Sequence, residues 1–105
     1  MMLLSIDYIP GKEIDAIGMV KGAIVQTKHF GNDFMAGMKT LVGGEITSYT
    51  DMLNEARQIA VKRMVDEAEA LGADAVIGIR YSSAQMMQGA AEVVAYGTAV
   101  KISSN

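Results

Sequence analysis

The segment from Ser48 to Leu71 constrains the fold more than any other part of the sequence. Apolar residues recur in it every three or four positions, and charged residues fill most positions between them. The apolar stripe consists of Leu53, Ala56, Ala60, Met64, Ala68 and Leu71. Ser48 with Asp51 resembles a capping box, and Gly72 is typical of the position after a helix end. We therefore predict a long amphipathic helix over residues 48–71 that buries this stripe against a sheet.

Two segments ahead of this helix predict strands. Residues 2–6 form a short apolar run that ends before a Pro-Gly turn signal. Residues 13–28 alternate in character, and one face consists of Ile14, Ala16, Gly18, Val20, Gly22 and Ile24. Glycine inside a strand marks a bend or the close approach of another backbone. We predict a long, curved strand that bends or breaks at Gly18 or Gly22.

The chain after the helix predicts an antiparallel hairpin. Residues 73–81 are a nearly continuous apolar run, as expected for a strand covered on both faces. Residues 92–102 return as a second strand, and one of its faces consists of Val94, Tyr96, Thr98, Val100 and Ile102. We expect a loop of several residues between the two strands, holding Met86-Met87 and a turn near Gly89.

The glycine pair Gly43-Gly44 admits two interpretations. A shorter helix, capped at Asn32 or Asp33, is predicted just before it, and a phosphate-binding loop would need glycines at the start of the following helix. The pair lacks the spacing and the lysine of such a loop, and Glu45 places a carboxylate where an anion would lie. We therefore interpret the pair as a hinge between two helices.

These elements predict a single α+β domain over residues 1–105. The expected order is β-β-α-α-β-β, with a mainly antiparallel, curved sheet packed by one long helix. Half of the 105 residues are hydrophobic but only 6% are aromatic, and this much apolar material on a short chain favours coverage by other copies. If the turn of the hairpin centres on Met87-Gln88, Gly78 and Gly97 lie nearly opposite and leave a smooth patch. We expect Val94, Tyr96 and Met86-Met87 at or near the contact between copies.

Composition limits the classes of function. The sequence has no cysteine, and its net charge of −3 is spread along the chain, so neither thiolate chemistry nor nucleic-acid binding is expected. The N-terminal residues lack the basic start of a signal peptide, and no segment reaches the roughly 20 apolar residues that span a bilayer. We expect a cytoplasmic protein that does not bind membranes.

Candidate ligands and catalytic groups are few. His29 and Asp33 are close enough in sequence to bind the same metal ion, although a closed metal shell needs more ligands. The nine methionines could bind Cu(I), or they could fill a core that is poor in aromatic residues. Glu67 is expected on a solvated helix face, and Asp74 can accept backbone N–H groups at a turn. No nucleophile, base and orienting group occur together, so we expect a protein without catalytic activity.

Several motifs together resemble one family. "FxNDFxAGMKxLVGG", "SYxxxLxEARxxA", "LGADAVIGI" and "GTAVKI" are similar, in order and spacing, to the YbjQ-like family of uncharacterised bacterial proteins, over residues 13–102. The resemblance implies a fold like that of the dodecin subunit and assembly as a ring-like homopentamer. The family carries a heavy-metal-binding label, which implies a divalent metal ion without a defined ligand set. This chain departs from the family in having Glu45 where arginine is common and in lacking carboxylates in "IRYSSAQ".

Two functions follow as expectations. The first is a pentameric protein without catalysis that holds a metal ion or a small ligand between subunits. The alternative, by analogy with dodecin, is a carrier of a flavin or another small ligand.

Overall fold

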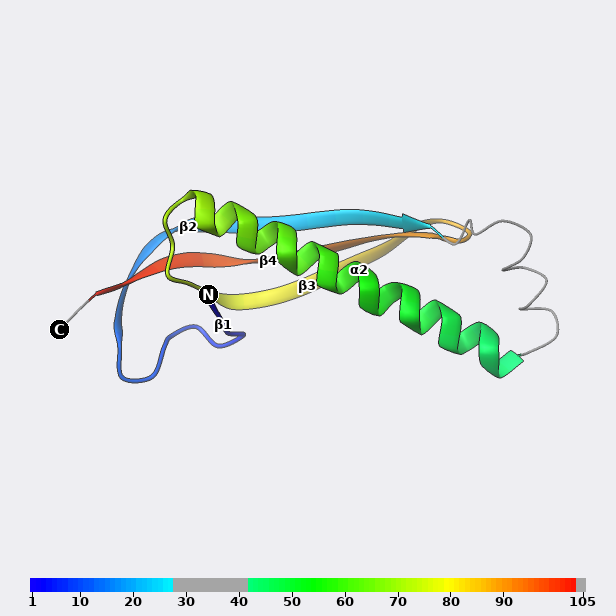
Figure 1. Cartoon of the computed structure of the whole chain (residues 1–105), viewed down its shortest axis with the longest axis horizontal. Helices are drawn as coiled ribbons and strands as arrows, with labels where there is room; N and C mark the ends of the chain where they lie inside the picture. The colour runs from blue at the N-terminus through cyan, green and yellow to red at the C-terminus, as the bar shows by residue number, and fades with distance from the viewer. Residues whose placement is uncertain (28–41, 104–105) are drawn as a thin grey trace.

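The computed structural model describes residues 1–27 and 42–103, with side chains of the helix described from Thr50 onward. The elements, in chain order, are β1 (Met2–Leu3), β2 (Glu13–Thr27), α2 (Val42–Ala70), β3 (Ala75–Met87) and β4 (Ala90–Ser103). The four strands form one sheet in the order β1-β3-β4-β2, and α2 crosses one face of it (Figure 1). β1 runs parallel to β3, and the other neighbours are antiparallel. The α+β class is therefore confirmed, whereas the shorter helix predicted after Asn32 lies mostly outside the described residues.

The start of α2 contradicts two predictions. Gly43 and Gly44 lie within α2, so this pair is not a hinge between two helices. Ser48 also lies inside the helix and is not its cap. A glycine inside a helix costs only about 1 kcal/mol relative to alanine, so favourable packing elsewhere can outweigh it. Local glycine content was therefore a poor guide to this boundary.

The end of α2 agrees with the prediction. Gly72 has a φ of 78°, and its N–H donates to Glu69 O at 3.0 Å. The N–H of Ala73 donates to Ala68 O at 3.1 Å, which completes a Schellman motif. The carbonyl groups of Ala68 and Glu69, in the last turn of the helix, are thereby satisfied before the chain enters β3.

Replacing Gly72 with alanine is expected to lower the free energy of unfolding by about 1 kcal/mol, because a Cβ is strained in the left-handed region. Urea unfolding at fixed protein concentration measures the loss. Gly72→Asn should cost less than Gly72→Ala, since asparagine tolerates this conformation. An equal loss in both variants would contradict the proposed cause.

A bulge in β2 divides the strand between the two faces of the sheet. Its register with β4 shifts by one residue between Ala16 and Gly18. Val20 and Ile24 consequently pack on the helix side, whereas Ile14 packs on the opposite side. The predicted single face from Ile14 to Ile24 is therefore wrong, because strict alternation fails where one extra residue enters a strand. The bulge lies directly before Gly18, one of the two positions at which a bend or break was predicted.

Apolar residues are buried on both faces of the sheet. The larger cluster lies between α2 and the sheet and contains Val20, Ala56, Ala60, Met64, Ala68, Val76, Val93, Ala95 and Ala99. The smaller cluster lies on the other face and contains Ile9, Ala75, Ile77 and Val100. The helix stripe predicted to face the sheet is confirmed at its centre, although Leu71 lies past the helix end and is exposed.

Two glycines allow close packing within the chain. A Cβ on Gly22 would collide with Ala60 O and Met64 N, and would lie 2.8 Å from Arg63 Cβ, so the backbone of α2 rests directly on β2. Gly97 lies opposite the bulge formed by Gly78 and the residue after it, as expected. A Cβ placed on Gly97 would lie 2.8 Å from Ile77 O. The backbone that approaches this glycine closely therefore belongs to the same chain.

The hairpin is tighter than predicted. β3 continues to Met87 and β4 begins at Ala90, so only Gln88 and Gly89 form the turn. Met86 and Met87 are therefore strand residues and not loop residues, although both side chains are exposed. In the sequence, the polar residues before Met86 indicate a loop. In the structure they belong to an exposed part of β3, where a strand can be polar because it is not buried.

Candidate functional site: an apolar pocket and an uncovered sheet face

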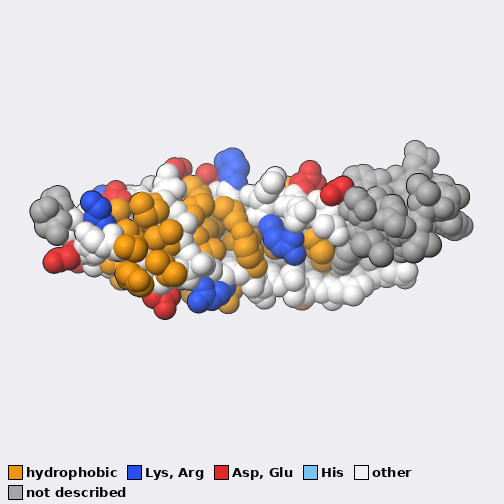
Figure 2. Space-filling model, turned by 90° about the horizontal axis from the view of Figure 1, so that it is seen from below, with side chains coloured by type: hydrophobic (Ala, Val, Ile, Leu, Met, Phe, Trp, Pro, Cys, Tyr) orange, Lys and Arg blue, Asp and Glu red, His pale blue; other side chains and the backbone are white. Residues whose placement is uncertain are grey.

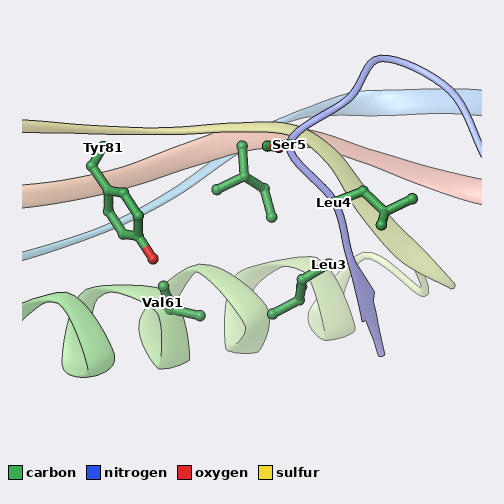
Figure 3. Close-up of a pocket in the computed structure, with 6 residues that line it drawn as sticks. Leu3, Leu4, Ser5, Val61 and Tyr81 are labelled. Atoms are coloured by element: carbon green, nitrogen blue, oxygen red, sulfur yellow. The ribbon is translucent and has the colours of Figure 1, made fainter.

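A pocket lies where the N-terminal segment, α2 and β3 meet. Its volume is about 310 Å³, and its lining consists of Leu3, Leu4, Ser5, Val61, Ile79 and Tyr81 (Figure 3). Backbone hydrogen bonds hold the N-terminal segment along β3: Leu4 N donates to Val76 O at 2.9 Å, and Ile79 N donates to Leu4 O at 3.1 Å. The guanidinium of Arg80 adds a hydrogen bond of 2.7 Å to Ser5 O. One wall of the pocket is thus fixed by main-chain geometry.

The lining is mainly aliphatic. Tyr81 extends from β3 toward α2, and its ring lies above Val61 (Figure 3). Among the described residues, Ser5 and Tyr81 supply the only hydroxyl groups of the lining, which contains no ionisable carboxylate, amine or imidazole. Such a pocket suits an apolar group with one hydrogen-bonding atom.

Hydrophobic side chains are also exposed around this pocket. Seen from below in the orientation of Figure 1, they gather on the half of the molecule that carries the N-terminal segment (Figure 2). The exposed large hydrophobic residues of this segment are Met1, Met2, Leu3, Ile6 and Tyr8. Scattered apolar residues are normal on a surface, whereas a group of them indicates a contact surface.

A second apolar surface lies on the face of the sheet opposite α2. The register between β2 and β4 places Met19, Ala23 and Val25 on this face, beside Val94 and Tyr96. Met19 is 74% exposed, Val25 52% and Tyr96 38%, so no described residue covers them fully. We call these five residues the open face. The predicted sharing of one face by Val94 and Tyr96 is confirmed, whereas Val100 is buried under Ile9 within the same chain.

The metal ligands predicted from the sequence are not among the residues that the structure describes. His29 and Asp33 lie outside the described residues, and residues 1–27 and 42–103 contain no group of three histidine or carboxylate side chains that could hold a metal ion. The described residues therefore do not fit a metal centre.

Two acidic residues have structural partners. Asp74 accepts a hydrogen bond from Ile102 N at 2.8 Å and lies 3.6 Å from Lys101 Nζ. Glu67 is exposed, as predicted, and also accepts a hydrogen bond from Lys21 N at 2.9 Å. Nothing in the periodicity of the helix indicated this contact, because it depends on how α2 lies across β2.

The fold and its surfaces define a small α+β protein with a mixed four-stranded sheet and exposed apolar surfaces. A family model described as "Putative heavy-metal-binding" matches residues 1–103, and the chain belongs to this YbjQ family. The resemblance seen in the sequence motifs is thereby confirmed.

Relatives match along nearly their whole length. A UPF0145 protein of Clostridium novyi is 61% identical over 102 residues, covering 97% of this chain and 99% of the relative. A UPF0145 protein of Thermotoga maritima is 55% identical over 103 residues, covering 97% of each chain. A crystal structure of a protein of unknown function from the DUF74 family of Pediococcus pentosaceus has a TM-score of 0.65 at 18% identity, covering 98% of each chain. This last likeness shows the fold alone.

The described part of the chain contains one helix, α2. No helix there is both long and apolar enough to cross a bilayer.

Proposed function

We propose that the protein is a non-enzymatic homo-oligomer in which copies of the chain cover one another's open face. The observation that carries this proposal is the exposure of Met19, Val25 and Tyr96 on the sheet face opposite α2, where Lys21 lies opposite Tyr96. Burying such a surface between copies removes apolar area from water at roughly 25 cal/mol per Å². A single helix layer cannot do this, because α2 already occupies the other face.

The number of copies in the proposal is five. It rests on the resemblance to the ring-forming, dodecin-subunit-like members of the family, and a ring needs a contact between two different surfaces of the chain. The open face supplies one such surface, and the exposed N-terminal segment supplies another. In this assembly the pocket beside Tyr81 is available to a small, mainly apolar ligand.

Replacing Val94 with glutamate is expected to reduce the assembly to smaller species, because a charge would enter the centre of the proposed contact. Sedimentation velocity measures the mass of the wild type, expected at five times the 11.2 kDa chain or a multiple of that mass, and of the variant. Leu71→Glu is the matched control, since Leu71 is an exposed apolar residue at the end of α2, away from the open face. A well-folded wild-type monomer at micromolar concentration would contradict the proposal, and so would equal loss of mass in both variants.

A further inference from the structure

The outward-facing main-chain groups of the sheet have hydrogen-bond partners along one long edge strand, β2, but not along most of the other, β3, among the described residues. On the β2 edge, Lys21 N donates to Glu67 Oε1 at 2.9 Å, and Arg63 donates to Ala23 O at 2.7 Å. These are main-chain groups that do not pair with β4, and charged side chains of α2 satisfy them. Charged coverage of this kind prevents an edge strand from pairing with another chain.

The β3 edge has no such coverage beyond its first residues. The N-terminal segment pairs with it as far as Ile79, whose N–H donates to Leu4 O at 3.1 Å. From Tyr81 to Met87, no described residue pairs with the outer main-chain groups of β3. We call residues 81–87 the free edge.

The register shows which residues present their main-chain groups outward. Lys21 and Ala23 direct theirs toward α2, so their partners on β4, Tyr96 and Val94, direct theirs toward β3. Tyr96 and Val94 face Arg80 and Ser82 of β3. The alternate residues of β3, which are Tyr81, Ser83 and Gln85, therefore point their N–H and C=O groups away from the sheet.

The composition of the free edge favours pairing. Its sequence, YSSAQMM, contains no charged residue, no proline and no glycine, and the side chains of Tyr81, Met86 and Met87 are more than half exposed. Sheets ordinarily protect long edges with lysine, proline or inward charges. The β2 edge follows this rule within the same molecule, and the free edge does not.

We infer that the free edge pairs antiparallel with the free edge of a second copy, about a twofold axis at Ser83. The other long edge is capped by Glu67 and Arg63, so it is a poor counterpart. In the twofold arrangement Ser83 lies opposite Ser83 of the second copy, and Tyr81 lies opposite Gln85. None of these residues is charged, so the paired side chains do not repel one another. The two residues of each pair exchange both of their main-chain hydrogen bonds. The paired stretch ends at the N-terminal segment on one side and at the hairpin turn on the other, and displaces neither.

This contact is additional to the one proposed for the open face. A twofold contact joins chains in pairs, so a ring of five would associate with a second ring into ten chains. Each contact can fail without the other, because they use different surfaces.

A cysteine scan tests the inference directly, since the chain has no cysteine of its own. In a hydrogen-bonded antiparallel pair the Cα atoms are about 5.5 Å apart, within the range that a disulfide bridges. Ser83→Cys is expected to give a covalent dimer under mild oxidation. Gln85→Cys, on the same edge but opposite Tyr81, is the matched control and should give little. Absence of the Ser83→Cys dimer, or equal cross-linking of both variants, would overturn the inference.

Proline at position 83 gives an independent measurement. Ser83→Pro removes an outward N–H without removing a bond to β4, so the fold should persist by circular dichroism while the number of chains is halved. Ser83→Ala keeps the N–H and should leave the mass unchanged. If the wild type is a pentamer and Ser83→Cys does not cross-link, the edge contact is wrong and the ring stands. If Ser83→Cys cross-links while Val94→Glu keeps its mass, the ring contact is wrong and the edge stands.

Discussion

Replacing Gly22 with alanine is expected to destabilise the protein by at least about 3 kcal/mol or to prevent its folding. The new methyl group would collide with Ala60 O and Met64 N, which belong to the backbone of α2. A flexible side chain could turn away, but here the whole helix would have to shift from the sheet. The shift would separate Met64 and Val20, which pack in the larger cluster.

Chemical denaturation at one fixed protein concentration measures this loss, because stability coupled to assembly depends on concentration. Lys62→Ala serves as the control. The side chain of Lys62 on α2 is 75% exposed and, among the described residues, pairs only with Asp66, at 3.1 Å, as a surface ion pair, so a change below about 0.5 kcal/mol is expected. If Gly22→Ala unfolds like the wild type, α2 does not rest on β2 as described.

Replacing Met64 with alanine is expected to lower the free energy of unfolding by about 2–5 kcal/mol. Met64 is the largest of the fully buried side chains and lies at the centre of the cluster between α2 and the sheet. Its neighbours Ala60 and Ala68 are too small to fill the resulting cavity. A domain of this size has only about 5–15 kcal/mol of stability in total, so this loss is a large part of it.

The same denaturation experiment, applied to Met64→Leu, separates volume from chemistry. Leucine has a similar volume, so this variant should lose less than about 1.5 kcal/mol. Similar large losses in both variants would indicate that the thioether itself is required, and that loss of volume is not the main cause.

Patterns of period 2 and 3.6 predicted most of the fold, because burial imposes them directly. The β2 strand and the stripe around Met64 were predicted this way, and the end of α2 was predicted from Gly72. The start of α2 was not, because glycine content suggested a break where the helix continues. The reversal of faces between Ile14 and Val20 was missed as well, since a bulge depends on register with β4 and leaves only a glycine as its trace.

The candidate site was less predictable than the fold. Val94 and Tyr96 were placed correctly on one face, because alternation along β4 is regular. The pocket beside Tyr81 joins residues from the two ends of the sequence and from α2, and no local pattern links them. The capping of β2 by Glu67 and Arg63 was equally hidden, because it depends on the crossing of α2 over the sheet.

The closeness of α2 to β2 has a consequence for how the molecule can change. A helix that rests on glycine and meets the sheet mainly through Ala56, Ala60 and Ala68 leaves a thin interior with little room for larger side chains. Substitutions that gain stability by filling space are therefore scarce inside a single chain. Mutations that add apolar contact are tolerated more readily on the outer surfaces, so selection for stability in this architecture would favour stronger association between copies.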